Sequence, residues 1–192
     1  MGQIDNFDFR GSTDEVGRIW TVGHSTRTTE EFNLILNSQG IETLVDVRAY
    51  PSSRRYPHFN MDALKESLRL VGVGYHHLAS LGGRRRGSPE SRNTAWKNPS
   101  FRAFADYMET SGFQQGIETL LQLSRERRTA VMCAEAVWWR CHRSLIADYL
   151  KAQGLTVVHI LSEKKAEIHP YTAAVSIIDG KLSYRGLLRE VE

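Results

Sequence analysis

The chain has 192 residues, of which 41% are apolar and 24% are charged, and its formal net charge at pH 7 is +3. This composition is typical of a folded globular domain with an ample core, and it argues against a disordered or fibrous chain. A net charge this small does not by itself indicate nucleic-acid binding. The chain has two cysteines, no apolar stretch long enough to span a bilayer and no secretory signal, so we expect a cytoplasmic protein with free thiols and no membrane partner.

The N-terminal segment differs in composition from the rest of the chain. Residues 1–17 are polar and contain glycine, so we expect a flexible arm, with a single α/β domain over residues 18–192. The apolar run 18–22 predicts the first strand, which ends at Gly23.

Helices and strands then alternate along the chain. Thr28 and Glu31 form a capping box, which predicts a helix that ends at Gly40. The elements predicted after it are a strand at 42–48, a helix at 61–72 capped by Asn60, a weaker strand at 74–78, two helices from Asn98 to 126 broken near Ser111–Gly112, a strand at 129–134, a helix at 141–154, a strand at 155–161, and a hairpin around Asp179–Gly180.

This alternation predicts a three-layer α/β domain with a mainly parallel, Rossmann-like sheet and a small C-terminal β-hairpin. Polar residues follow three of the predicted strands: the segment 24–27 follows the first, Arg48 the second and Glu135 the fourth. Because ligands bind at the carboxyl edge of such sheets, we expect these residues to form one site.

The candidate site residues divide into three groups by their chemistry. Acid, imidazole and thiol groups are the catalytic candidates: Glu135, His24, His142 and Cys141. Hydroxyl and guanidinium groups are the candidates for binding an anion: Ser25, Thr26, Arg27, Arg48, Arg54 and Arg143. Asp46, as an ion-pair partner of Arg48, and Cys133, as a packed thiol, are assigned supporting roles.

The segment MCAEAVWWRCHR (132–143) contains both cysteines and leaves several interpretations open. A disulfide is disfavoured by the expected compartment. A reactive thiolate, or two small buried thiols, fits the sequence better. A zinc site could use Cys133, Cys141, His142 and a distant residue such as His24, but the Cys-x7-Cys-His spacing matches no common structural zinc pattern. No metal site is therefore predicted, and no cofactor is identified.

The same segment also predicts a contact between charges. Glu135 lies at the end of a predicted strand and Arg143 lies in the first turn of the next predicted helix, so both are expected to be buried. Because an uncompensated buried charge costs several kcal/mol, we expect these side chains to form a salt bridge or share an ion, in one pocket with the 24–27 loop.

Five ordered segments resemble one known family: TVGHSTRTTEEF, LVDVRAYPSSRRYPHF, YHHLASLGGRRRG, MCAEAVWWRCHRSLIADYL and HPYT. They are similar to the domain-of-unknown-function family 488, over about residues 19–184. The resemblance implies a compact cytoplasmic α/β domain whose activity is not established.

Besides a thiol-dependent or zinc-dependent protein, which would use Cys133 and Cys141, two functions are compatible with these features. The first is an enzyme, a hydrolase or transferase of unknown reaction, that acts on a phosphorylated, nucleotide-like or nucleic-acid substrate. The second is a non-catalytic nucleic-acid-binding module that uses its arginine-rich loops, through Arg54, Arg55, Arg84, Arg85 and Arg86. The sequence leaves the substrate and the oligomeric state open.

Overall fold

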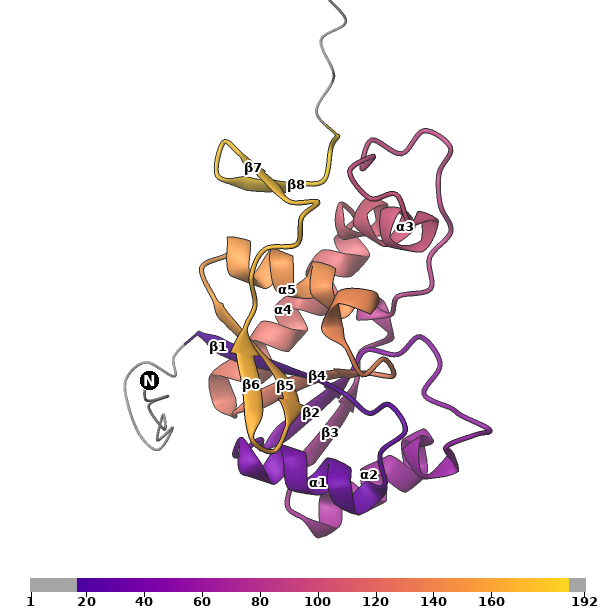
Figure 1. Ribbon diagram of the computed structural model, residues 1–192, viewed down its shortest axis with the longest axis vertical. Coiled ribbons are helices and arrows are strands. Elements are labelled where there is room, and N and C mark those ends of the chain that lie inside the picture. Colours follow the sequence, from indigo (N-terminus) through magenta and orange to yellow (C-terminus); the bar gives the residue numbers. More distant parts are fainter. Residues whose placement is uncertain (1–16, 187–192) are drawn as a thin grey trace, which may run out of the picture.

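The computed structural model describes residues 17–186, and the predicted N-terminal arm lies outside these residues except for Gly17. The described residues form a six-stranded sheet with the order β3-β2-β4-β1-β5-β6 (Figure 1). Five strands are parallel and the edge strand β6 is antiparallel to β5. The strands are β1 (Arg18–Gly23), β2 (Thr43–Asp46), β3 (Gly74–His77), β4 (Thr129–Cys133), β5 (Thr156–Ser162) and β6 (Lys165–Ile168).

Helices cover both faces of this sheet, which confirms the three-layer fold. Figure 1 shows α1 and α2 below the sheet and α3, α4 and α5 above it. A two-stranded antiparallel hairpin lies beyond the upper helices, as predicted. The helices are α1 (Thr29–Ser38), α2 (Met61–Leu70), α3 (Pro99–Met108), α4 (Ser111–Glu126) and α5 (Arg143–Ala152), and the hairpin is β7 (Ser176–Ile178) and β8 (Lys181–Ser183).

Two apolar cores result from the alternation of side chains along the strands. On one face Trp20 and Leu44 pack with Phe32 of α1 and Leu64 of α2. On the other face, residues of alternate register pack with α3, α4 and α5, among them Ile19, Val45, Val131 and Cys133. Both faces of the central strands are therefore buried, which explains why they read as nearly continuous apolar runs.

The helix starts show which capping predictions hold. Thr28 and Glu31 form the predicted capping box, and Asn98 accepts hydrogen bonds from the first amides of α3. Asn60 occupies the position before α2, but its side chain caps nothing there. Its Oδ1 instead accepts a hydrogen bond from the Ser53 amide at 2.6 Å, so it orders the loop after β2.

The structure differs from the sequence-based elements at one helix start and in one additional strand. The helix predicted from Cys141 begins at Arg143, because a 3₁₀ helix (Trp138–Arg140) precedes it and Cys141 has an extended backbone with φ −129° and ψ 145°. Strand β6 was missed because its residues are mostly exposed and two of its four are charged, so it carries no apolar pattern. Among the described residues, no helix is long and apolar enough to cross a membrane.

The strand order brings the predicted polar loops together. β4 lies between β2 and β1, so the carboxyl ends of these three strands are neighbours. Backbone hydrogen bonds continue past the strand ends, from His24 to Cys133 at 3.0 Å and from Ser25 to Ala134 at 2.8 Å. The loops after β1, β2 and β4 therefore meet at one edge of the sheet.

Candidate functional site

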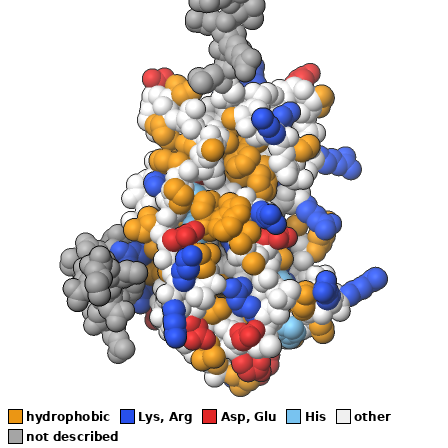
Figure 2. All heavy atoms as spheres, viewed as in Figure 1, with side chains coloured by type: hydrophobic (Ala, Val, Ile, Leu, Met, Phe, Trp, Pro, Cys, Tyr) orange, Lys and Arg blue, Asp and Glu red, His pale blue; other side chains and the backbone are white. Residues whose placement is uncertain are grey.

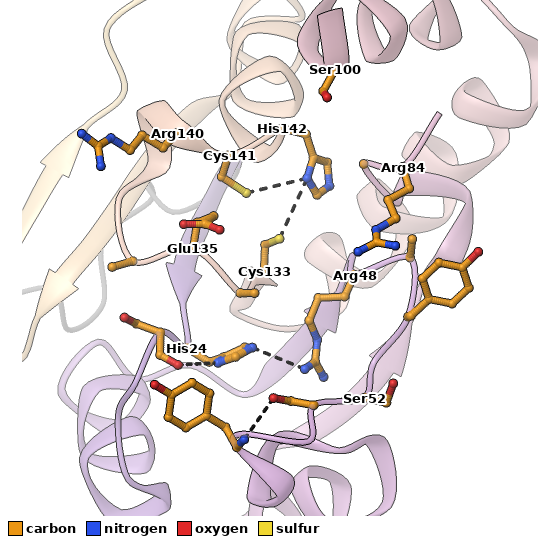
Figure 3. Close-up of a pocket in the computed structure, with 18 of the residues that line it drawn as sticks. His24, Arg48, Ser52, Arg84, Ser100, Cys133, Glu135, Arg140, Cys141 and His142 are labelled. Atoms are coloured by element: carbon orange, nitrogen blue, oxygen red, sulfur yellow. Dashed lines mark hydrogen bonds between the residues drawn. The ribbon is translucent and has the colours of Figure 1, made fainter. Parts of the chain in front are cut away.

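A cavity of about 900 Å³ opens at this carboxyl edge, and its volume is within the range of small-molecule sites. It is formed by the loops after β1, β2, β3 and β4, together with the first residues of α3 (Figure 3). The cavity brings together eight of the residues predicted from the sequence: His24, Ser25, Thr26, Arg48, Cys133, Glu135, Cys141 and His142.

Arg48 is held by a buried carboxylate beneath the cavity. Its Nε and Nη2 donate to Asp46, with the Nη2–Oδ2 contact at 2.6 Å, and Asp46 is fully buried. Asp46 also accepts hydrogen bonds from the Arg48 amide at 3.0 Å and from the Tyr75 hydroxyl at 2.8 Å. The predicted ion pair is therefore present, and it leaves Nη1 of Arg48 with no carboxylate partner.

His24 lies beside that free guanidinium nitrogen. Its ring stacks on Phe59 with centroids 4.2 Å apart, and Nε2 is 3.4 Å from Nη1 of Arg48. Nδ1 is 3.0 Å from the Ser25 carbonyl, an acceptor, so Nδ1 carries the proton and Nε2 offers a lone pair to Arg48. Burial, reinforced by the positive charge of Arg48, lowers the pKa of His24 to about 4. His24 is therefore neutral at pH 7, and its low pKa makes it a weak base.

Cys133, Cys141 and His142 form a compact cluster in the floor of the cavity. The two sulfurs lie 3.9 Å and 3.7 Å from Nδ1 of His142 (Figure 3). Nε2 of His142 is 3.0 Å from the Leu81 carbonyl oxygen. All three side chains are buried, and the cysteines are free thiols. Two sulfurs and one imidazole nitrogen thus converge on a single point.

The pKa values of the two thiols are shifted in opposite directions because each thiol changes the environment of the other. The hydrogen bond from Cys141 lowers the pKa of Cys133 well below its usual range, and the contact with His142 adds to this effect. The same hydrogen bond, together with burial, raises the pKa of Cys141. Cys133, rather than Cys141, is therefore the thiol that ionises first.

The predicted salt bridge between Glu135 and Arg143 is absent. Glu135 is exposed toward the cavity, so the burial that was expected to require a partner does not occur. Arg143 is 1% exposed, and its guanidinium donates to the backbone carbonyls of Val22, Glu135 and Ala136 at 2.7–3.0 Å. It is the carbonyl oxygen of Glu135, not its carboxylate, that Arg143 contacts.

Two other predicted anion-binding residues do not line the cavity. The guanidinium of Arg27 donates to the carbonyl oxygens of Gly23 and Leu161. Arg54 is exposed in the loop after β2, outside the cavity lining. Arg27 and Arg143 thus tie loops to the sheet, in positions where their Nη1 and Nη2 nitrogens already have carbonyl acceptors.

Residues that the sequence did not assign to this site also line it. Arg140 is in the 3₁₀ helix, Arg84 follows β3, and Tyr50 and Arg55 are in the loop after β2. In Figure 3 the Arg84 side chain extends toward Arg48, whereas that of Arg140 points away from the thiols. The arginine-rich composition of the loop after β3 was a visible signal, but only the strand order shows that this loop meets the others.

Several basic side chains project from the surface near the loops after β2 and β3 (Figure 2). In Figure 2 they project along the right-hand edge, on the side where Figure 1 places the loops that follow β2 and β3. Arg84 lies over the Tyr50 ring, with 5.5 Å from its guanidinium carbon to the ring centroid. Arg85 is different, because it donates to the carbonyls of Ala79, Ser80 and Gly82 and lies 3.5 Å over the Tyr107 ring.

The fold and the site define a class: a parallel α/β domain with a polar, arginine-lined cavity at the carboxyl edge of its sheet. The family model "Domain of unknown function DUF488" matches residues 28–150. The chain therefore belongs to this family, as its sequence segments indicated. No curated protein and no solved structure matches the chain.

Proposed function

We propose that this protein is an enzyme that acts on a phosphate-bearing, nucleotide-like substrate bound in the cavity. One observation carries the proposal: of the described residues that line the cavity, four are arginines and Glu135 is the single acid. The arginines are Arg48, Arg55, Arg84 and Arg140. Guanidinium groups bind phosphate through two parallel, charge-assisted hydrogen bonds.

Two of these arginines are suited to contact the anion directly. Arg48 is oriented by Asp46 and keeps Nη1 toward the cavity. Among the described residues, Arg84 has no ion-pair partner, and its side chain extends into the same space (Figure 3). A ligand phosphate between them would supply the negative charge that this side of the cavity lacks.

Glu135 is the candidate general base. Its carboxylate is exposed to the cavity from the loop after β4, on the same edge as the thiol–imidazole cluster. A carboxylate that is accessible to the substrate can take a proton from an attacking water or hydroxyl group. The neutral His24 is less suited to this role, because its Nε2 lone pair faces Arg48.

The test separates binding from catalysis. Calorimetric titration with inorganic phosphate and with a mononucleotide should show that Arg84→Gln weakens binding about tenfold or more, as expected for the loss of a charge-assisted hydrogen bond. Arg69→Gln, an exposed arginine on α2 away from the cavity, is the matched control and should bind normally. The absence of binding by the unmodified protein at low salt would refute the proposal.

Catalysis is then tested with generic phosphate monoesters and diesters that release a chromophore. Glu135→Gln should keep the phosphate affinity and lose about 100-fold or more in turnover, as is usual for a general base. A Glu135→Gln protein with full activity would remove this residue from the mechanism.

A non-catalytic nucleic-acid-binding module is the second candidate, and the exposure of Tyr50 supports it. Tyr50 is 67% exposed at the rim of the cavity beside Arg84, which is the arrangement that stacks on an unpaired base. Arg54, Arg55 and Arg86 are exposed in the neighbouring loops, whereas the contacts of Arg85 leave it less available. A salt titration with labelled single- and double-stranded oligonucleotides tests this candidate, since affinity should fall steeply as salt rises.

A further inference from the structure

Outside the arginines, the strongest unassigned feature is the cluster of Cys133, Cys141 and His142. Their ligand atoms, two Sγ and one Nδ1, all lie within 4.8 Å of one another. Around a tetrahedral zinc ion, bonds of about 2.3 Å to sulfur and about 2.0 Å to nitrogen separate sulfur from nitrogen by about 3.5 Å and sulfur from sulfur by about 3.8 Å. The observed Nδ1–Sγ distances of 3.7 and 3.9 Å need only small shifts to match.

The tautomer of His142 is the one that a metal ligand requires, with Nδ1 free to coordinate. The Leu81 carbonyl oxygen can only accept, so Nε2 at 3.0 Å from it carries the proton. In the neutral ring, Nδ1 then has a free lone pair, and this lone pair faces the two sulfurs. Histidines that ligate metals commonly donate their other N–H to such a carbonyl, which fixes the tautomer and the ring orientation.

We infer that this cluster binds one zinc ion, with Cys133, Cys141 and His142 as its three protein ligands. Two thiolates and an imidazole favour zinc over magnesium or calcium, which prefer oxygen ligands.

The fourth coordination position faces the cavity. Among the described residues, no further cysteine, histidine or carboxylate lies close enough to serve as a fourth ligand. All three residues of the cluster line the cavity. Three protein ligands with one open position are the pattern of catalytic zinc sites, in which water or substrate completes the tetrahedron. A role for this position in catalysis rests on the proposed function, whereas the metal site itself does not.

The backbone at Gly83, after β3, packs against the imidazole ring of His142 and helps to fix its orientation. A Cβ at Gly83 would lie 2.5 Å from Nδ1 and 2.6 Å from Cγ of His142, so the backbone after β3 packs directly on this ring. The ring is thereby held between Gly83 and Leu81, on the side from which Arg84 enters the cavity.

The experiment uses the full chain purified without a histidine tag from cells supplied with zinc. Elemental analysis should give a zinc-to-protein ratio near one. After removal of zinc, loading with cobalt should produce visible bands of a tetrahedral site and near-ultraviolet bands of thiolate-to-cobalt charge transfer. These bands report the ligand set of the unmodified protein, so the test does not depend on whether a variant folds.

Variants then assign the ligands. Cys133→Ser, Cys141→Ser and His142→Gln should each lose the bound zinc or its cobalt spectrum, with circular dichroism as the check of folding. His76→Gln, an exposed histidine on β3, is the matched control and should retain both. A protein that takes up neither zinc nor cobalt, or one that instead forms a Cys133–Cys141 disulfide under air, would overturn the inference.

The outcomes also separate this inference from the proposed function. If a protein without zinc binds phosphate in a way that depends on Arg84, the proposed anion site is supported and the proposed zinc site is refuted. If the three ligands bind zinc but the protein binds no phosphate-bearing compound, the zinc site is supported and the proposed function is refuted.

Discussion

The buried ion pair beneath the cavity gives a sharp test of how this site is supported. Asp46 is 0% exposed and Arg48 is 6% exposed, and Asp46 is held by the Arg48 side chain, the Arg48 amide and Tyr75. Asp46→Ala would leave the guanidinium buried without its counter-charge. Such truncations cost about 3–5 kcal/mol, because the remaining charge has lost both its partner and its hydration.

Removal of the other groups should cost less. Tyr75→Phe removes one hydrogen bond to a charged acceptor and should lower the unfolding free energy by about 1.5–3 kcal/mol. Replacement of both charges, in Asp46→Leu with Arg48→Met, should recover most of the loss, because apolar groups of similar volume remove the desolvation cost as well as the attraction. The double variant would nevertheless lose the arginine that we assign to phosphate binding.

Urea unfolding followed by circular dichroism gives these free energies, and an exposed ion pair provides the control. Glu66 and Arg69 on α2 lie 2.8 Å apart but are 60% and 67% exposed, so Glu66→Ala should leave the midpoint unchanged. If Asp46→Ala lost less than about 1 kcal/mol, the buried pair would behave as a surface pair does, and our account of its burial would be refuted.

The remaining predictions concern the frame around the site. Burial, followed by the effects of His169 and Arg143, lowers the pKa of His159 from 6.5 to about 2, so the folded ring stays neutral while the unfolded chain takes up a proton. Stability is then fully present above pH 6.5 and is lost as pH falls toward 2, by about 2 kcal/mol between about pH 8 and about pH 5. Urea titrations should show a shallower pH dependence in His159→Gln, and equal slopes would contradict this. Gly23→Ala should lower the unfolding free energy by about 3 kcal/mol or more in the same assay, since its Cβ would lie 1.8 Å from the Glu135 carbonyl oxygen; wild-type stability would show that the loops can separate. Thr28→Ala should cost about 1 kcal/mol by loss of the capping box, and a thermal melt that is unchanged would contradict this.

The arrangement of the elements could be predicted because local chemistry determines it. The runs that became β1, β2 and β4 are apolar on both faces, and the capping box at Thr28 sets the start of α1 by two reciprocal hydrogen bonds. The convergence of the loops after these strands is also expected from general rules, because parallel strands share one carboxyl edge. The short strand β6 could not be predicted, since it is defined by its pairing with β5 rather than by its own side chains.

The thiol–imidazole cluster shows what residue spacing alone could not predict. The seven residues between Cys133 and Cys141 resemble no common zinc motif, and this argued against a metal. In the fold, however, the intervening 3₁₀ helix turns the chain back, so that Cys141 returns to the end of the strand from which Cys133 departs. The proximity of these three side chains depends on their positions in space, and the loop that brings them together carries no sequence signal of its own.

The arginines are where sequence reasoning reaches its limit, and Arg143 shows what decides their roles. A guanidinium at a buried helix start is equally consistent with binding a ligand or bracing the backbone, because both need oxygen acceptors. The structure supplies three carbonyl oxygens to Arg143, from the end of β1 and from the loop after β4. Gly23 has no side chain, and this is what allows the two loops to approach so closely. Arg143 therefore holds together the two loops that present His24 and Glu135, and it shapes the cavity without lining it. Arg48 and Arg84 keep nitrogens that no protein carboxylate occupies, so they, rather than the more deeply buried arginine, are the groups that we propose to bind an anion.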